Sequence, residues 1–254
     1  ASVYSYKKEI QTLTMQMMDN YLRYRTGQVN QAVWAKETEI VVEKMNALNK
    51  FSIFSRLYQA HMLIEQEKYN EAQWILNRIA AAYENKEELE VEPSTYSYFL
   101  YLTTLYDRTD ERREQILQEV TGYYHNHPEN HRLLWVLLHL DEQYEGNSLK
   151  KYLMIEEQFH KGANSPLLYL EAYSVIALNP VYLTKLEDFE LQLLQFGFKY
   201  KMYNQDLIGQ LIYLSGKQKN FSEKLLRLLE FCYQETGNKE CLQNICTLLT
   251  KGNQ

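Results

Sequence analysis

Three histidines near the middle of the chain are the side chains that could most directly hold a metal ion. His125, His127 and His131 fall within seven consecutive positions, and Glu129 or Asp141 could add a carboxylate. Imidazole nitrogens and carboxylate oxygens are ordinary zinc ligands. The spacing is poor for that purpose, because it sets the ligands at a helix end and a turn, without cysteine and without an HExxH motif. Solvated turn histidines explain the pattern as well. We therefore expect no metal and no other cofactor.

The three cysteines are the next candidates for a nucleophile or a ligand. Cys232 and Cys241 fall on apolar stripes and Cys246 lies beside one, where cysteine behaves as a small hydrophobic residue. No histidine lies near them in the sequence to activate a thiol. An odd number of late, clustered cysteines also argues against a disulfide framework and favours a reducing compartment. We therefore predict a cytoplasmic protein.

The stretch 107–114 (DRTDERRE) mixes both signs of charge. As a site it could supply carboxylates for acid–base chemistry or an arginine pair for phosphate. In a purely structural role, it is a turn that leads into a helix exposed to solvent. Closely mixed charges are typical of such an exposed face. The chain has no glycine-rich phosphate loop, no GxSxG motif and no paired-cysteine zinc spacing. We predict that the protein is not an enzyme. A metal-binding or enzymatic helical domain that uses His125, His127 and His131 is the alternative.

Tyrosine is unusually frequent, with 22 residues against nine phenylalanines and three tryptophans. Its ring packs like that of phenylalanine but keeps a polar tip, which suits both thin helical layers and recognition surfaces. Most of these tyrosines should pack in the interior, because aromatic stripes at helical spacing are usually core. The residues that we single out as contacts for a partner are Tyr96, Tyr98, Tyr101, His131, Trp135, Tyr169 and Tyr173.

The elements that must position these side chains are short helices that recur about every 35 residues, a period typical of stacked repeats. A second apolar run follows each of the first five before the next one begins. Such repeats stack because one helix pair cannot bury its own apolar face. The first runs begin near Ser52, Ser94, His131, Pro166, Asn204 and Asn238.

Local signals place several helix ends and one close contact. Ser52 and Ser165 are hydroxyl N-caps, and Pro166 follows the second at the first helical position. A helix over 183–200 is expected to pack against the one that begins at Pro166. Gly209 is expected to allow two helices to approach closely, because it has no side chain.

The segment 57–83 reads LYQAHMLIEQEKYNEAQWILNRIAAAY and resembles a tetratricopeptide repeat. Lys68 departs from the family, which usually has Gly-Asp or Gly-Asn just before the tyrosine. The resemblance implies an all-α, right-handed superhelix of stacked antiparallel helix pairs, with about 13 helices in this chain. It also implies that the first helices line a concave face that holds a peptide. The matching small, tyrosine, alanine and leucine positions are Ala60, Tyr69, Ala72 and Leu76.

Composition narrows the kind of partner. The net charge of −6 disfavours nucleic acid, whose backbone is bound by an excess of lysine and arginine on one face. No continuous apolar stretch approaches the roughly 18 residues of a transmembrane helix, so we expect no membrane insertion. We expect an interaction or scaffold module that binds a protein or peptide segment on the concave face, as a monomer or weak homodimer. An RNA-binding helical repeat is the second alternative, because that class shares the period.

The chain is predicted to be a single helical-repeat domain over 1–254. Its sub-blocks 1–84 and 94–254 are joined by an acidic connector at 85–93, which has little apolar surface to bury. The chain lacks an initiator methionine and ends after a first helix without a second, so we expect a section of a longer protein. As a whole it resembles the tyrosine-rich helical-repeat regions of large bacterial proteins of unassigned function, a likeness that implies no activity.

Overall fold

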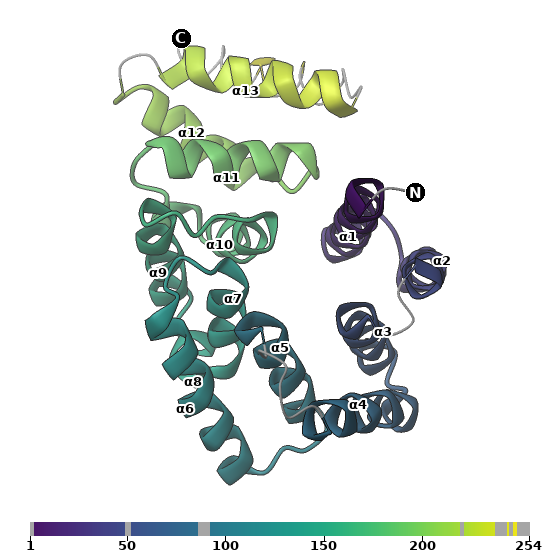
Figure 1. Cartoon of the computed structure of the whole chain (residues 1–254). Coiled ribbons are helices and arrows are strands. Elements are labelled where there is room, and N and C mark those ends of the chain that lie inside the picture. The colour runs from purple at the N-terminus through teal and green to yellow at the C-terminus, as the bar shows by residue number, and fades with distance from the viewer. Residues whose placement is uncertain are drawn as a thin grey trace. The chain divides into compact units, whose positions relative to one another are not determined.

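The described part of the chain folds into helices joined by short turns. The structure, a computed structural model, describes residues 3–48, 52–85, 92–218, 221–236, 243 and 246–247. Within these ranges it contains thirteen α-helices, one short 3₁₀ helix and no strand (Figure 1). The predicted all-α class and number of helices are therefore confirmed for this part of the chain. None of the helices found there is both long enough and apolar enough to cross a membrane.

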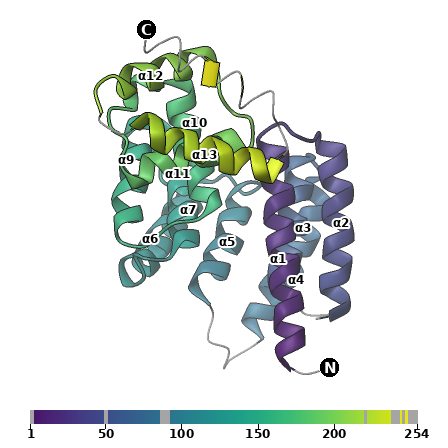
Figure 2. The ribbon, with the colours of Figure 1, turned by 90° about the horizontal axis from the view of Figure 1, so that it is seen from above.

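The helices divide into two compact units, Ala1–Glu142 and Gln143–Gln254. The helices of the first unit are α1 (Val3–Arg25), α2 (Gln31–Leu48), α3 (Ile53–Glu65), α4 (Tyr69–Glu84), α5 (Pro93–Thr104), α6 (Asp110–Asn126) and α7 (His131–Leu140), and α8 (Glu142–Glu145) begins at its boundary. Consecutive helices pack together, and Figure 2 shows α1 and α2 lying side by side along their lengths. Further contacts join α3 to α5 and α5 to α7, so these three helices form a continuous row.

Local caps explain where the three helices of this row begin. The Ser52 hydroxyl accepts a hydrogen bond from the Ser55 N–H at 3.4 Å, as predicted. The Glu92 carboxylate accepts from two backbone N–H groups in the first turn of α5. Asn130 Oδ1 accepts from two N–H groups in the first turn of α7, at 3.1 and 3.0 Å. Each cap satisfies donors that have no partner within the helix, and so fixes the N-terminus of that helix.

The helices α3 and α4 form the pair whose sequence resembles a tetratricopeptide repeat. The small residues Ala60 and Ala72 are fully buried, as close packing of two helices requires. Leu76 is buried as well, whereas Tyr69 keeps 39% of its surface exposed. The small and apolar positions of the motif therefore pack as expected within this pair. The right-handed superhelical winding of the whole array stays a prediction.

The second unit again packs neighbouring helices together. It contains α9 (Ser148–His160), α10 (Pro166–Leu178), the 3₁₀ helix η1 (Pro180–Tyr182), α11 (Asp188–Lys199), α12 (Gln205–Ser215) and α13 (Phe221–Thr236). The helix α10 packs on α9 and α11, and α13 packs on α11 and α12 (Figure 1). Ser165 caps α10 as predicted, because its hydroxyl accepts from the Leu168 N–H at 3.5 Å.

The helix predicted over 183–200 begins later than expected. Its first residue is Asp188, because the chain first turns through η1 after Pro180. Glu187 then opens α11 with a capping box, in which the Glu187 N–H donates to Glu190 Oε2 at 3.0 Å. The proline and this cap override the apolar pattern of the residues between them.

The close approach of two helices occurs at Gly197, and the prediction of Gly209 is wrong. Gly209 is exposed, and a Cβ atom added there would meet nothing within 4 Å. A Cβ atom added at Gly197 in α11 would come within 2.0 Å of Tyr173 Cζ in α10. The Tyr173 side chain is fully buried, and its hydroxyl donates to the carbonyl of Met202. The missing side chain at Gly197 is therefore what allows this ring to lie directly against α11.

Two predictions concern residues outside the described ranges. Most of the acidic connector 85–93 falls on 86–91, and the helix expected from Asn238 falls mostly on residues that the structure does not describe.

The boundary between the two compact units lies after Glu142. The single domain with sub-blocks 1–84 and 94–254 stays a prediction.

Gly197→Ala should destabilise the second unit. The new methyl group would displace the buried Tyr173 ring, and overpacking of this kind costs about 1–3 kcal/mol. Gly209→Ala is the matched control, because the same change on an open helix surface should stabilise the protein by up to about 1 kcal/mol. Urea unfolding followed by far-ultraviolet circular dichroism measures both. A Gly197→Ala protein as stable as the wild type would contradict this packing.

Candidate functional site

Aromatic rings from four helices of the first unit meet along the row α3, α5 and α7. Ring centroids of neighbours lie 4.3–6.4 Å apart, and every pair is tilted or edge to face, the geometry that aromatic rings prefer. The contact of His61 with Trp135 joins α3 to α7 across α5. We call this cluster the aromatic face, and its members are Tyr21, Tyr58, His61, Tyr98, Tyr101, Trp135 and His139.

His61 in the aromatic face has a polar partner on each side of its ring. Its Nδ1 lies 2.7 Å from the Tyr98 hydroxyl, and its Nε2 lies 3.5 Å from Glu65 Oε1. Tyr24 in α1 donates from its hydroxyl to Glu65 Oε2 at 3.2 Å. An ionised carboxylate can only accept, so the tautomer that fits carries its proton on Nε2 and accepts from Tyr98 at Nδ1. The hydrogen bond from His61 lowers the pKa of Glu65.

This polar chain contains a hydroxyl beside a base, and both side chains are buried. Tyr98 keeps only 6% of its surface exposed, and burial raises its pKa well above the usual value. A phenol in that setting stays protonated at neutral pH. The contacts that link Tyr98, His61 and Glu65, with the bond from Tyr24, therefore join α1, α3 and α5.

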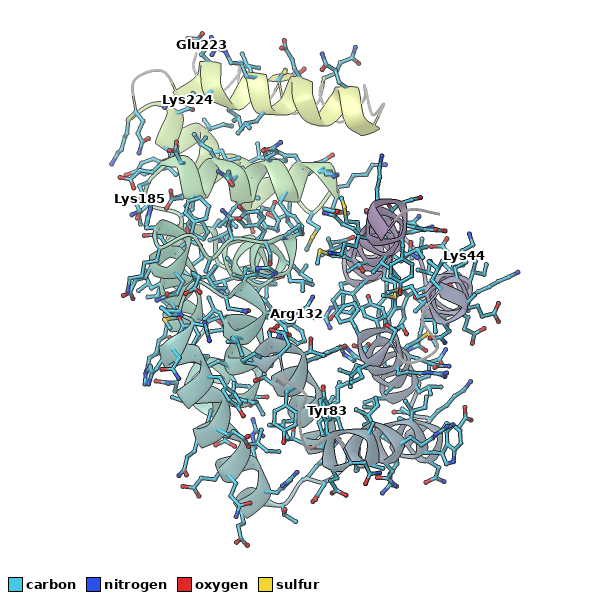
Figure 3. The ribbon with its side chains drawn as sticks, in the orientation of Figure 1. Lys44, Tyr83, Arg132, Lys185, Glu223 and Lys224 are labelled. Atoms are coloured by element: carbon cyan, nitrogen blue, oxygen red, sulfur yellow. The ribbon has the colours of Figure 1, made fainter. Side chains whose placement is uncertain are left out.

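The helix α7 presents three side chains with N–H groups on one of its sides. Arg132, Trp135 and His139 follow at helical spacing and share that side. The guanidinium carbon of Arg132 lies 4.6 Å from the ring centroid of Phe54, on the side of α7 that faces α3 (Figure 3). Arg132 is half-buried and forms no ion pair within the described residues. Burial lowers the pKa of Arg132, although the Glu92 carboxylate opposes this.

Comparison with known proteins places the chain in a family. A family model described as a family of unknown function (DUF5717), N-terminal, matches residues 2–254. The chain belongs to this family. No curated protein and no solved structure matches it. The DUF5717 description names no activity.

Three of the predicted contact residues of this DUF5717 chain lie on the aromatic face. Tyr98 and Trp135 keep 6% and 5% of their surfaces exposed, whereas Tyr101 is half-buried. The two buried rings cannot meet a partner without moving, so they support the face and Tyr101 forms part of its edge. Their contact with a partner stays a prediction.

The other predicted contacts lie elsewhere. Tyr96 packs against Tyr83, with ring centroids 5.0 Å apart, and His131 is half-buried at the start of α7. Burial, helped by the neighbouring arginine, lowers the pKa of His131. Tyr169 is half-buried in the second unit, and Tyr173 is fully buried there. These side chains are therefore not gathered with the aromatic face into one site.

Several residues of this region were not predicted as contacts. Helical spacing could have indicated Arg132 and His139, because they lie one turn before and one turn after the predicted contact Trp135 and so share its side of the helix. Phe54 and His61 give no such signal, because they meet α7 only through the packing of the row.

The histidine cluster shows no metal-binding arrangement. Within the described ranges, no group of three or more His, Cys, Asp and Glu side chains is placed to hold a metal ion. His125 and His127 are exposed, and His127 Nδ1 lies 3.8 Å from Glu129 Oε1. The metal-binding alternative gains no support from this region.

The thiol of Cys246, which lies in the part of the chain that the structure describes, is not activated. Cys246 is half-buried, and burial raises the pKa of its thiol, with the charge of Glu230 acting in the same direction. A protonated thiol is a poor nucleophile. Cys241 lies outside the described residues.

The charged stretch 107–114 borders a pocket of the first unit. Arg113 donates from Nε and Nη2 to the carbonyl of Leu140, both at 3.2 Å, and so caps the C-terminus of α7. This arginine is therefore committed to a structural contact, as expected of a turn and helix start. The pocket measures about 390 Å³ and is lined by Asp110, Arg113, Glu114, Leu117, Leu140, Asp141 and Glu142.

Two carboxyl groups of the second unit share a hydrogen bond. Glu190 keeps only 1% of its surface exposed, and its carboxyl bonds that of Glu156 in α9. Burial and this neighbour raise the pKa of Glu190 to about 8. Burial of Glu156 acts in the same direction, but the bond from Glu190 and the Lys185 ammonium, 2.8 Å from its Oε1, lower its pKa. Glu190 therefore holds a proton at neutral pH, where an ordinary glutamate has lost it.

The proton on Glu190 should make stability fall as the pH rises. The folded state keeps this proton up to about pH 8, whereas the unfolded chain releases it near the ordinary pKa of 4.5. The stabilisation that comes from this proton is fully present below the pKa of the unfolded state. It is lost as the pH rises through the pKa of the folded state. Between these two pKa values, the free energy of unfolding should change by up to about −1.4 kcal/mol per pH unit.

Glu190→Gln removes the titrating group and should flatten this slope, as urea unfolding across the same pH window would show. Glu157→Gln is the control, because Glu157 is an exposed carboxylate on α9, paired with Lys161. A Glu190→Gln protein whose stability falls as steeply as that of the wild type would place the proton elsewhere.

Tyr98→Phe removes the hydroxyl that bonds His61 Nδ1 and leaves the ring in place. Loss of this buried hydrogen bond should lower the free energy of unfolding by about 1–2 kcal/mol. Tyr69→Phe is the control, because Tyr69 keeps 39% of its surface exposed, and the change should stay within about 0.5 kcal/mol. Urea denaturation measures both. Equal stability of Tyr98→Phe and the wild type would show that this bond does not hold α5 to α3.

Proposed function

We propose that this chain is a non-enzymatic interaction module that binds an extended protein segment on the aromatic face of its first unit. The observation that supports the proposal is that each helix of the row α3, α5 and α7 adds rings to one cluster. Large, rigid rings supply contact area at a low cost in side-chain entropy and dominate binding energy at interfaces. A row of helices with such rings suits a segment that runs across the row.

The half-buried side chains are the proposed contacts. Tyr101, His139 and Phe54 keep part of their rings open to solvent. The buried Trp135 contacts both Tyr101 and His139, with ring centroids 5.6 and 4.3 Å apart, and fixes their positions. A partner would therefore meet a preorganised surface, which reduces the entropy lost on binding.

The proposal extends to the array as a whole. We propose that its pairs stack as in a tetratricopeptide-like right-handed solenoid within a larger protein, where Tyr96, His131 and Tyr169 offer further contacts. The net charge of −6 favours a protein partner over nucleic acid. The odd, clustered cysteines favour a cytoplasmic location. We propose a monomer or a weak homodimer.

Panning a displayed library of random short peptides on the chain tests the proposal. We expect a restricted set of peptides to be enriched on the wild type. Enrichment should fall at least about tenfold on a Tyr101→Ala/His139→Ala protein, because two contact rings are lost. Tyr213→Ala is the control, because it removes the ring of a residue on α12 of the second unit that keeps 54% of its surface exposed. No enriched peptide on the wild type, or the same set at the same yield on a folded double variant, would overturn the proposal.

A further inference from the structure

Arg132 is a half-buried cation beside the aromatic face, and its place is fixed from two sides. Asn130 Oδ1 accepts the Arg132 backbone N–H at 3.1 Å and so holds the start of α7. The Phe54 ring, 4.6 Å from the guanidinium carbon, supports the head group from α3. The guanidinium is therefore held on the side of α7 that faces α3 (Figure 3).

Four arginines of the chain have an acidic partner, and Arg132 is not one of them. Arg23, Arg25, Arg113 and Arg227 each form an ion pair with a glutamate. Arg132 forms no ion pair and no side-chain hydrogen bond within the described ranges. A guanidinium carries five N–H donors, and withdrawing them from water without acceptors costs free energy. A bound carboxylate would supply the missing acceptors.

Glu92 is a carboxylate within electrostatic reach of Arg132, but its oxygens are engaged elsewhere. They accept from the N–H and hydroxyl groups of Ser94 and Thr95 at 2.6–3.1 Å. These bonds lower the pKa of Glu92, although burial opposes them. Glu92 therefore offsets part of the charge of Arg132 and leaves its donors open.

A second donor on the same side of α7 also lacks an acceptor. Trp135 follows Arg132 by one turn, and its buried indole N–H has no hydrogen-bond partner within the described residues. The backbone N–H groups at the start of α7 are different, because Asn130 already caps two of them. Because the indole N–H is buried, the Arg132 guanidinium is the donor on this side that a partner can reach, and an acceptor-rich group suits it better than an apolar one.

We infer that the segment bound at the aromatic face carries an aspartate or glutamate whose carboxylate binds the Arg132 guanidinium. The inference rests on the proposed function and names the chemistry of its partner. A planar guanidinium matches a carboxylate through two parallel N–H···O bonds. Phosphorylated segments are typically bound by clusters of arginines, whereas the other arginine beside this face, Arg25 over the Tyr21 ring, is paired with Glu65. Because the chain carries a net charge of −6, a preference for acidic peptides has to arise locally, at Arg132.

The displayed peptide library tests the inference with two arginine variants. Peptides enriched on the wild type should contain Asp and Glu more often than the input library, and this excess should disappear on Arg132→Gln. Arg78→Gln should retain the excess. It is a matched control, because Arg78 also lies over a ring, 4.8 Å from the Trp74 centroid, on the exposed surface of α4.

A synthetic copy of one enriched peptide gives the direct measurement. Replacing its acidic residue by the corresponding amide should weaken binding to the wild type at least about tenfold, and should change binding to Arg132→Gln little. Urea unfolding checks that each variant is folded. If Arg132→Gln does not fold, Arg132→Lys replaces it, because lysine keeps the charge, lacks the paired donors and should reduce the acid preference.

The outcomes separate this inference from the proposed function. No enriched peptide on the wild type overturns both. Enriched peptides without an excess of acidic residues, or with the same excess on Arg132→Gln, overturn the inference alone. Tighter binding of a phosphopeptide or a single-stranded oligonucleotide than of the acidic peptide overturns it as well.

Discussion

Both ring nitrogens of His61 need a partner in the interior of the first unit, because a buried polar group left without one costs about 1–3 kcal/mol. The Tyr98 hydroxyl in α5 is the partner of one nitrogen, and the Glu65 carboxylate, in the next turn of α3, is the partner of the other. These partners lie on different helices, so α5 cannot slide along α3 without losing one bond. Trp135 packs on both His61 and Tyr98, and the position of α7 follows from theirs.

Helix starts could be predicted from the sequence because the groups that fix them are neighbours in the chain. Ser52 and Ser165 bond donors in the turn that follows each of them. The segment 183–200 shows the limit of such signals. Its apolar pattern suggests one helix throughout, but η1 after Pro180 and the capping box at Glu187 delay the start. Where local signals compete, proline and caps prevail over periodicity.

The candidate site could be predicted only in part, because burial depends on helices that are distant in sequence. Residue type predicts Tyr98 and Tyr173 as contacts, yet neighbouring helices cover both of them. Helical spacing from Trp135 would have indicated Arg132. Nothing local indicates that Phe54 supports its guanidinium, because that contact joins α3 to α7.

The contact between Tyr173 and Gly197 couples two positions on neighbouring helices. The tyrosine ring occupies the space that a side chain at 197 would need, and its hydroxyl bonds the Met202 carbonyl. A larger residue at 197 fits only if position 173 becomes smaller, and a smaller residue at 173 leaves a cavity unless 197 grows. In related DUF5717 sequences these two positions should therefore vary together, so that their covariation would reveal the packing of α10 on α11.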